Sequence, residues 1–113
     1  MAAFVGDANR VPGIRRGGSI ETELGLLPCA VGDGDLALVR PEHVVLEARP
    51  DGAAQVVGVE YYGHDQAVTV RLPSGRLVRA RLAATTVLQV GDTVRASATT
   101  ATAALPSDAS GGA

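Results

Sequence analysis

The sequence predicts an all-β domain, a small antiparallel sandwich or barrel, on three observations. Apolar and polar residues alternate along several short segments, which is the period of a strand with one buried face. Tight turns containing glycine separate these segments, so that strands recur at roughly 8–12-residue spacing. The chain has 113 residues, enough for one domain, and a helical turn is conceivable only within residues 82–90.

The alternation assigns side chains to faces. The residues expected to face the core are Ile20, Thr22 and Leu24; Val68, Val70 and Leu72; Val78, Ala80 and Leu82; and Val94, Ala96 and Ala98. The connectors agree with this assignment. Pro73-Ser74-Gly75 reads as a hairpin loop, and Gly58, in the middle of the run 52–62, indicates a bulge or a barrel corner.

The composition predicts a thin core and excludes several partners. Aromatic residues are limited to Phe4, Tyr61 and Tyr62, so small aliphatic side chains must fill the interior, and a second copy would help to cover it. A net charge of −2 and a pI near 5.6 argue against bulk attraction to nucleic acid or an anionic membrane. Cys29 is the single cysteine, so an internal disulfide is impossible. No apolar run approaches the ~20 residues of a membrane helix, and the first residues do not read as a signal peptide.

Catalytic and metal motifs are not found. The phosphate-binding loop G-x-x-x-x-G-K-[ST] needs a lysine, and every basic residue here is arginine. No serine occupies G-x-S-x-G. His64 and Asp65 are adjacent, but we favour a solvated turn over a catalytic pair because no nucleophile is near in sequence. Cys29, His43 and His64 lack metal-ligand spacing, and Cys29 reads better as a small buried apolar residue.

Outward-facing arginines are the most suggestive surface feature. They are Arg71, Arg76, Arg79, Arg81 and Arg95. A nucleic-acid groove would also need aromatic rings among the charges, and the arginine segments carry none. We therefore favour a solvated face with cross-strand ion pairs to acidic residues, the candidates being Glu21, Glu23, Glu47 and Glu60.

The stretch 36–47, LALVRPEHVVLE, contains a polar interruption, Arg40-Pro41-Glu42-His43, between two apolar runs. Pro41 cannot donate to a strand ladder, and it favours extended geometry at Arg40. Arg40 and Glu42 are close enough to pair or to cap exposed backbone amides. We expect a corner that ends one strand and starts the next.

These residues resemble the TOBE domain, a C-terminal extension of many ABC-importer ATPase subunits. LVRPEHVVL (38–46) looks like its Arg-Pro-Glu motif, and the remaining segments follow in family order. They are FVGDANRVPG (4–13), GSIETELGLLP (18–28), VVGVEYYGHDQAVTVRL (56–72) and VLQVGDTVRAS (87–97). The motif residues are Arg40, Pro41, Glu42, Gly63, Gly91 and Asp92. The sequence around Gly63 is most similar to that of the ferric-iron branch, and polyamine, thiamine, sulfate and phosphonate importers are its relatives.

The resemblance implies an OB-like antiparallel β-barrel of five to six strands. It divides the chain into a junction remnant of a preceding ATPase domain (1–13), the TOBE-like barrel (14–98) and a low-complexity tail (99–113), as in an excised domain. It also implies a non-catalytic regulatory or dimerisation role, without a cofactor of its own, since ATP and magnesium would bind the preceding domain.

The expected partners are a second copy, the ATPase domain and the membrane permease subunits, at the cytoplasmic face of the cell membrane. An alternative is a small-oxyanion-binding module with contacts from Arg40, Arg79 or Arg81. An OB-type nucleic-acid module is the less favoured reading.

Overall fold

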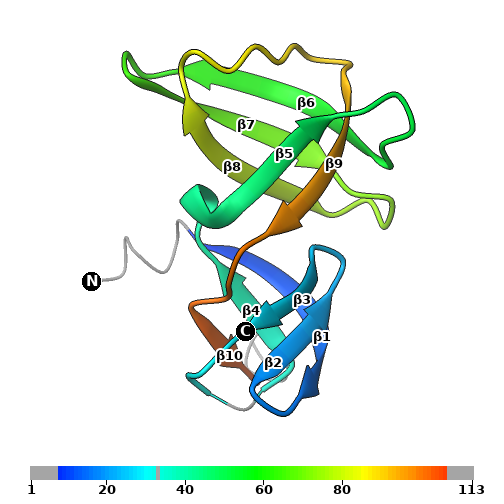
Figure 1. The fold of residues 1–113 in the computed structure, drawn as a ribbon, viewed down its shortest axis with the longest axis vertical. Helices are drawn as coiled ribbons and strands as arrows, with labels where there is room; N and C mark the ends of the chain where they lie inside the picture. Colours follow the sequence, from blue (N-terminus) through cyan, green and yellow to red (C-terminus); the bar gives the residue numbers. More distant parts are fainter. Residues whose placement is uncertain (1–7, 33, 107–113) are drawn as a thin grey trace.

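The computed structural model describes residues 8–32 and 34–106, which form two five-stranded antiparallel sheets. One sheet has the order β10-β4-β1-β2-β3, and the other has the order β5-β9-β6-β7-β8. The strands are β1 (Asn9–Arg16), β2 (Ser19–Thr22), β3 (Gly25–Pro28), β4 (Leu36–Val39), β5 (Val44–Ala48), β6 (Ala54–Tyr61), β7 (Asp65–Arg71), β8 (Leu77–Ala83), β9 (Thr93–Ala98) and β10 (Ala103–Leu105). Figure 1 shows the two sheets as neighbouring bodies, the first built from both ends of the described chain and the second from its middle.

The all-β antiparallel class is confirmed, but the single barrel of five to six strands is wrong. Ten strands form two sheets, and among the described residues neither sheet closes through a ladder. In the second sheet the edge strands β5 and β8 approach each other without pairing. The short 3₁₀ turn η1 (Pro41–His43), just before β5, packs against β8. The side chain of Asn9 forms hydrogen bonds with the backbone carbonyl and N–H of Arg79 on β8. These two backbone groups are therefore satisfied without a ladder to β5.

Both expected flanking segments contribute strands to the first sheet. Strand β1 begins at Asn9, inside the segment 1–13 that we expected to be a junction remnant, and pairs with β4 and β2. Strand β10 lies inside the expected tail 99–113 and pairs with β4. The small residues of this tail indicated disorder, yet Ala101 and Ala104 are buried because their methyl groups fit against the sheet. Residues 1–7 and 107–113 lie outside the described residues.

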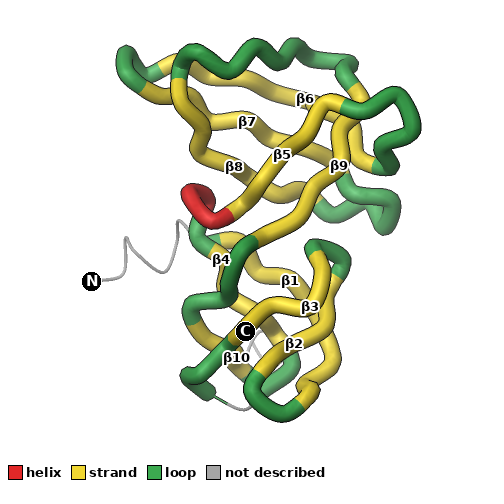
Figure 2. The backbone as a smooth tube through the Cα atoms, viewed as in Figure 1, coloured by secondary structure: helices red, strands yellow, loops and turns green. Residues whose placement is uncertain are grey.

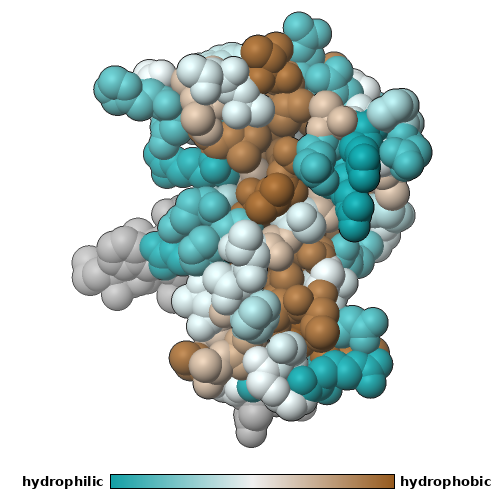
Figure 3. Space-filling view, in the orientation of Figure 1, coloured by the Kyte–Doolittle hydropathy of each residue, from teal (hydrophilic) through white to brown (hydrophobic). Residues whose placement is uncertain are grey.

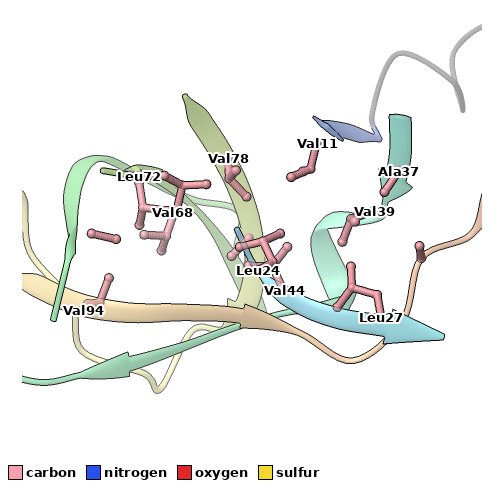
Figure 4. Packing of buried hydrophobic residues seen from close by; sticks show 14 of the residues in the cluster. Val11, Leu24, Leu27, Ala37, Val39, Val44, Val68, Leu72, Val78 and Val94 are labelled. Atoms are coloured by element: carbon pink, nitrogen blue, oxygen red, sulfur yellow. The ribbon is translucent and has the colours of Figure 1, made fainter. Parts of the chain in front are cut away.

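One apolar cluster joins the two sheets. Val11, Ala37 and Val39 enter it from the first sheet, and Val68, Leu72, Val78 and Val94 belong to the second sheet and the end of β7. Leu24 and Val44 lie between these two groups in Figure 4, and Leu27 lies on the side of Ala37 and Val39. The backbone N–H of Ala98 donates to the carbonyl of Leu24 at 3.2 Å, which ties β9 to the β2–β3 turn. The molecule is therefore packed as one unit, from the small aliphatic residues that the composition predicts.

Three local expectations are confirmed. The β6–β7 register shifts between Val56 and Gly58, which is the bulge expected at Gly58. The loop after β7 is a tight turn in which Gly75 has φ of 91°, a value that favours glycine. The inward and outward faces of β7 and β8 follow the predicted alternation.

Candidate functional site

The Arg40–His43 stretch is a corner between β4 and β5. Arg40 is extended (φ −71°, ψ 146°), and Pro41 begins the 3₁₀ turn η1. The N–H of His43 donates to the carbonyl of Arg40 at 2.9 Å, and Arg40 Nε donates to Glu42 Oε2 at 3.1 Å. Figure 2 shows this turn in red, at the boundary of the two sheets. The sequence interpretation as a corner, with Arg40 and Glu42 paired, is confirmed.

A pocket of about 430 Å³ opens beside this corner. Its lining comes from the residue before β1, the η1 corner, the end of β6, and strands β7 and β8. The lining residues are Ala8, Arg40, Pro41, Glu42, Tyr62, Ala67, Arg79, Ala80 and Arg81. The structure thus brings together Arg40, Arg79 and Arg81, which are the three residues that sequence reasoning named as candidate anion contacts.

Strand geometry places two of these arginines side by side. Arg79 and Arg81 are two residues apart on β8, so both project from the outer face, while Val78 and Ala80 are buried. Arg81 Nε donates to Asp65 Oδ2 at 2.7 Å, and Arg79 Nη2 lies 3.9 Å from Glu60 Oε1. Both arginines therefore have an acidic partner on another strand; Glu60 is one of the predicted partners, and Asp65 is not.

The other predicted acidic partners have different contacts. Glu21 pairs with Arg16 at 2.9 Å, and Glu23 accepts a hydrogen bond from Ser74. Glu47 lies opposite Arg95 in the β5–β9 register. All these contacts are on exposed side chains, so each contributes little to stability.

Hydrogen bonds and nearby opposite charges favour the charged forms of Glu42 and Arg81. A hydrogen bond from its own backbone N–H, together with the Arg40 guanidinium, lowers the pKa of Glu42 below its ordinary value. The hydrogen bond to Asp65 raises the pKa of Arg81, with a smaller contribution from Glu42. The pocket therefore presents fixed cations and one fixed anion at neutral pH.

The aromatic ring of Tyr62 lies beside the outward-facing Arg81 of β8, a contact that sequence reasoning missed. The guanidinium carbon of Arg81 lies 6.0 Å from the centroid of the Tyr62 ring, within cation–π range. Tyr62 is exposed, just after β6, and its N–H donates to the carbonyl of Asp65 at 2.8 Å. This turn, with Gly63 at φ 78°, brings Tyr62 beside β8. A single ring is not the series of stacking platforms that a nucleic-acid groove uses.

The other predicted residues lie outside the pocket lining. Gly91 has φ of 101°, and Asp92 Oδ2 accepts from the N–H of Gln89 at 2.9 Å, so both shape the turn before β9. His64 is exposed in the β6–β7 turn, as expected. Cys29 is 2% exposed, which confirms its interpretation as a buried apolar residue. Among the described residues, no group of three His, Cys, Asp or Glu side chains could hold a metal ion.

Two buried polar residues were also missed. Asn9 bridges the sheets through hydrogen bonds to Val39 and Arg79. Gln66 is fully buried on β7, and its Nε2 donates to the carbonyls of Ala83 and Thr86 in the segment after β8. A signal for Gln66 existed, because it stands two residues before Val68 on the inward face of the alternation. Nothing in the sequence around Asn9 indicates its role.

The fold and the corner define an all-β accessory module. The family model of the TOBE domain matches residues 37–105, more than half of the chain, and the chain belongs to this family. TOBE domains are associated with the regulatory regions of ABC-transporter ATPases and with oxyanion binding, and the domain alone is generally non-catalytic. No curated protein matches the chain. Among the described residues, no helix is long and apolar enough to cross a membrane.

Proposed function

We propose that the chain is the regulatory and self-association domain of the ATP-binding subunit of an ABC importer. The observation that carries this proposal is the family match, which starts in β4, includes the Arg40–Glu42 corner and extends through β10. The domain acts by contact with partners, and ATP and magnesium bind the ATPase domain that precedes it in such subunits. The proposed site of action is the cytoplasmic face of the cell membrane, beside the permease subunits.

The physical role of such a domain is to raise effective concentration. When two extensions remain in contact, closure of the two attached ATPase domains becomes an intramolecular step. A ligand that binds the extension more tightly in one state then biases the transport cycle by its difference in affinity.

An apolar surface supports self-association. Figure 3 shows apolar side chains running through the middle of one face across both sheets, with hydrophilic residues on either side. Large apolar residues exposed on the molecule include Leu26 on β3 and Val45 on β5, at 61% and 40%. Covering such surface is favourable in proportion to its apolar area.

Light scattering of the purified chain at high micromolar concentration tests self-association. We expect the mean mass to rise with concentration toward that of a dimer. A Val45→Glu variant, which replaces an exposed apolar side chain of β5 with a charge, should stay monomeric, while Ser74→Glu in the β7–β8 turn serves as the control. A strict monomer at the highest concentration would contradict the self-association proposal.

The ferric-iron branch is the transport class that we propose, with polyamine, thiamine, sulfate or phosphonate uptake as the neighbouring classes. The segment Tyr61-Tyr62-Gly63-His64-Asp65 resembles the ferric-iron branch most, which supports this choice. The reading frame upstream of Met1 in the natural gene provides the test of the importer assignment. A Walker motif and an ABC signature there would support it, and an initiation site at Met1 would contradict it.

A second candidate function is the binding of a small oxyanion. The pocket that gathers Arg40, Arg79 and Arg81 favours it, because guanidinium groups match oxyanions geometrically. Thermal-shift titrations with molybdate, sulfate, phosphate and ferric chelates test it, since a ligand that binds the native state raises the melting temperature saturably. No shift with any of them would remove this candidate. Nucleic-acid binding stays disfavoured, and oligonucleotide binding at physiological salt would reverse that preference.

A further inference from the structure

The geometry points to a small organic anion, with a carboxylate or phosphate group on a planar apolar body, as the ligand of the arginine-lined pocket. This inference rests on the anion-binding candidate of the proposed function and is independent of the importer assignment. It goes further because it names which anions the pocket accepts and which wall selects them.

The pocket's size is the first argument. Its volume of about 430 Å³ corresponds to roughly fourteen water molecules at about 30 Å³ each. A bare tetrahedral oxyanion is roughly two or three water volumes and would leave most of this space to solvent. Cavities of ~300–1,000 Å³ are the range in which proteins bind organic ligands. The volume therefore favours a ligand with a carbon body.

The pocket's charge is the second argument. Three guanidinium groups and one carboxylate line it, and two further carboxylates, Asp65 and Glu60, lie outside the lining beside Arg81 and Arg79. Arg81 uses its Nε in the pair with Asp65, and Arg40 uses its Nε in the pair with Glu42. A guanidinium carries five N–H donors in a planar fork, so each arginine can keep its ion pair and still donate to a ligand. The free donors of the guanidinium groups, and not a net positive charge, are therefore what an anionic ligand would use.

The position of the carboxylate decides where the anionic group sits. Glu42 stands on the η1 wall, and the Arg40 contact helps to keep it ionised. Arg79 and Arg81 project from the β8 wall. Repulsion from Glu42 disfavours an anionic group at the η1 wall, so we expect this group to contact the donors that Asp65 and Glu60 leave free on the β8 arginines.

The composition of the remaining wall is the third argument. Tyr62 supplies an aromatic ring beside Arg81, and the other uncharged lining residues are Ala8, Pro41, Ala67 and Ala80. The side chains on this wall offer a bare oxyanion no hydrogen bond apart from that of the tyrosine hydroxyl. A planar body can stack on the ring while its acidic group reaches the guanidinium forks. The apolar wall thus distinguishes organic from inorganic anions.

Isothermal titration calorimetry of the 113-residue chain at low salt tests the inference, with isophthalate as the probe. Its uncharged diamide, isophthalamide, and sulfate are the comparison ligands. We expect isophthalate to bind saturably at one site per chain, isophthalamide to give no saturable heat, and sulfate to bind at least about tenfold more weakly. Arg79→Gln and Arg81→Gln should each weaken isophthalate about tenfold or more. Both side chains are about half exposed, so these variants should fold, which circular dichroism would check.

Two further variants separate the walls. Tyr62→Leu should weaken isophthalate about threefold or more and leave sulfate unchanged. Arg95→Gln, an exposed arginine on β9 outside the lining, should change neither ligand. Sulfate binding as tightly as isophthalate, or no effect of Tyr62→Leu, would overturn the organic-anion inference while keeping the oxyanion candidate. No saturable binding of either anion would overturn both, and light scattering would still decide self-association separately.

Discussion

The side chain of Asn9 and the backbone of Arg79, 70 positions apart, exchange two hydrogen bonds. Asn9 Nδ2 donates to the carbonyl of Arg79 at 2.8 Å, and the N–H of Arg79 donates to Asn9 Oδ1, also at 2.8 Å. The amide thus reproduces the pattern of a strand neighbour at the edge of β8. Since Nδ2 also donates to the carbonyl of Val39, one side chain connects both sheets. The pocket wall formed by Arg79 is therefore fixed from the first sheet.

Asn9→Leu should destabilise the chain substantially. The leucine has a similar branched shape, though it is larger, and it leaves the N–H and carbonyl of Arg79 and the carbonyl of Val39 without this partner. Unpaired groups that are at least partly buried cost about 1–3 kcal/mol each, so we expect the free energy of unfolding to fall by at least about 3 kcal/mol. Urea denaturation followed by circular dichroism measures it.

Ser74→Ala provides the control for this prediction. Its hydroxyl donates to Glu23 at 2.7 Å across an equally long-range but exposed contact. Water replaces an exposed partner, so the loss should stay within about 0.5 kcal/mol. If Asn9→Leu costs no more than Ser74→Ala, the bridge does not hold the sheets together.

Gln66 gives a prediction with a pH dependence. Gln66→Glu would place a carboxylate in a fully buried site, against the carbonyls of Ala83 and Thr86 that the amide now serves. Burial and these carbonyls should raise the pKa of the introduced carboxyl above the ordinary value of about 4.3. At pH 7 the variant should lose several kcal/mol.

The sign of the effect follows from proton linkage. A raised pKa means that the native state of this variant binds the proton more tightly than the unfolded chain does. Its stability therefore falls as pH rises from the unfolded value through the folded value, and the deficit shrinks again on acidification. Urea denaturation at pH 4.5 and pH 7 should show a smaller loss at the lower pH. Gln66→Leu, which introduces no charge, should lose about 1–3 kcal/mol at both values.

Replacing glycine with alanine should have different effects on stability at Gly52 and at Gly58. A Cβ at Gly52 would overlap the backbone carbonyl of Val94, whereas a Cβ at Gly58 would meet the Thr69 side chain no closer than 3.7 Å. A backbone carbonyl cannot move aside for the added methyl group, whereas the end of a flexible side chain can. We expect Gly52→Ala to cost about 1–3 kcal/mol and Gly58→Ala to be close to neutral. Thermal unfolding of both variants measures the difference, and equal melting temperatures would contradict it.

Sequence reasoning predicted the strands in which the alternation of apolar and polar residues agrees with the burial of their side chains. Along β7 and β8, the inward position of Val68 and the outward position of Arg79 follow directly from period two. The pattern could not assign β10, because the buried methyl of Ala104 is indistinguishable in sequence from those of a disordered tail. Nor could it show that β5 and β8 stay unpaired, since closure depends on contacts across the fold such as Asn9 with Arg79.

Sequence reasoning likewise predicted one part of the pocket and missed another. Sequence reasoning named its three arginines because alternation places Arg79 and Arg81 outward and Pro41 marks a corner at Arg40. It missed Tyr62 as a wall because the turn at Gly63 carries this residue past the end of β6 and beside β8. A strand pattern contains no information on where such a turn directs the next side chain.

The last prediction concerns the titration of Glu42. Its pKa lies below the ordinary value of 4.5 because of the backbone hydrogen bond first and the Arg40 guanidinium second. Removing the guanidinium in an Arg40→Gln variant should raise the pKa of Glu42 toward 4.5 but not restore it fully, since the backbone contact remains.

A lowered folded pKa means that this contact stabilises the chain above pH 4.5 and that the contribution is lost as pH falls through the folded value. The carboxylate is largely solvated, so the contribution should stay below about 0.5 kcal/mol. A pH titration of the Glu42 side-chain resonance by NMR, in wild type and in Arg40→Gln, gives both pKa values. Arg16→Gln, which removes the pair with Glu21 at the far end of β1, should leave the Glu42 titration unchanged. An identical Glu42 pKa with and without the Arg40 guanidinium would show that the 3.1 Å pair at the corner does not persist in solution.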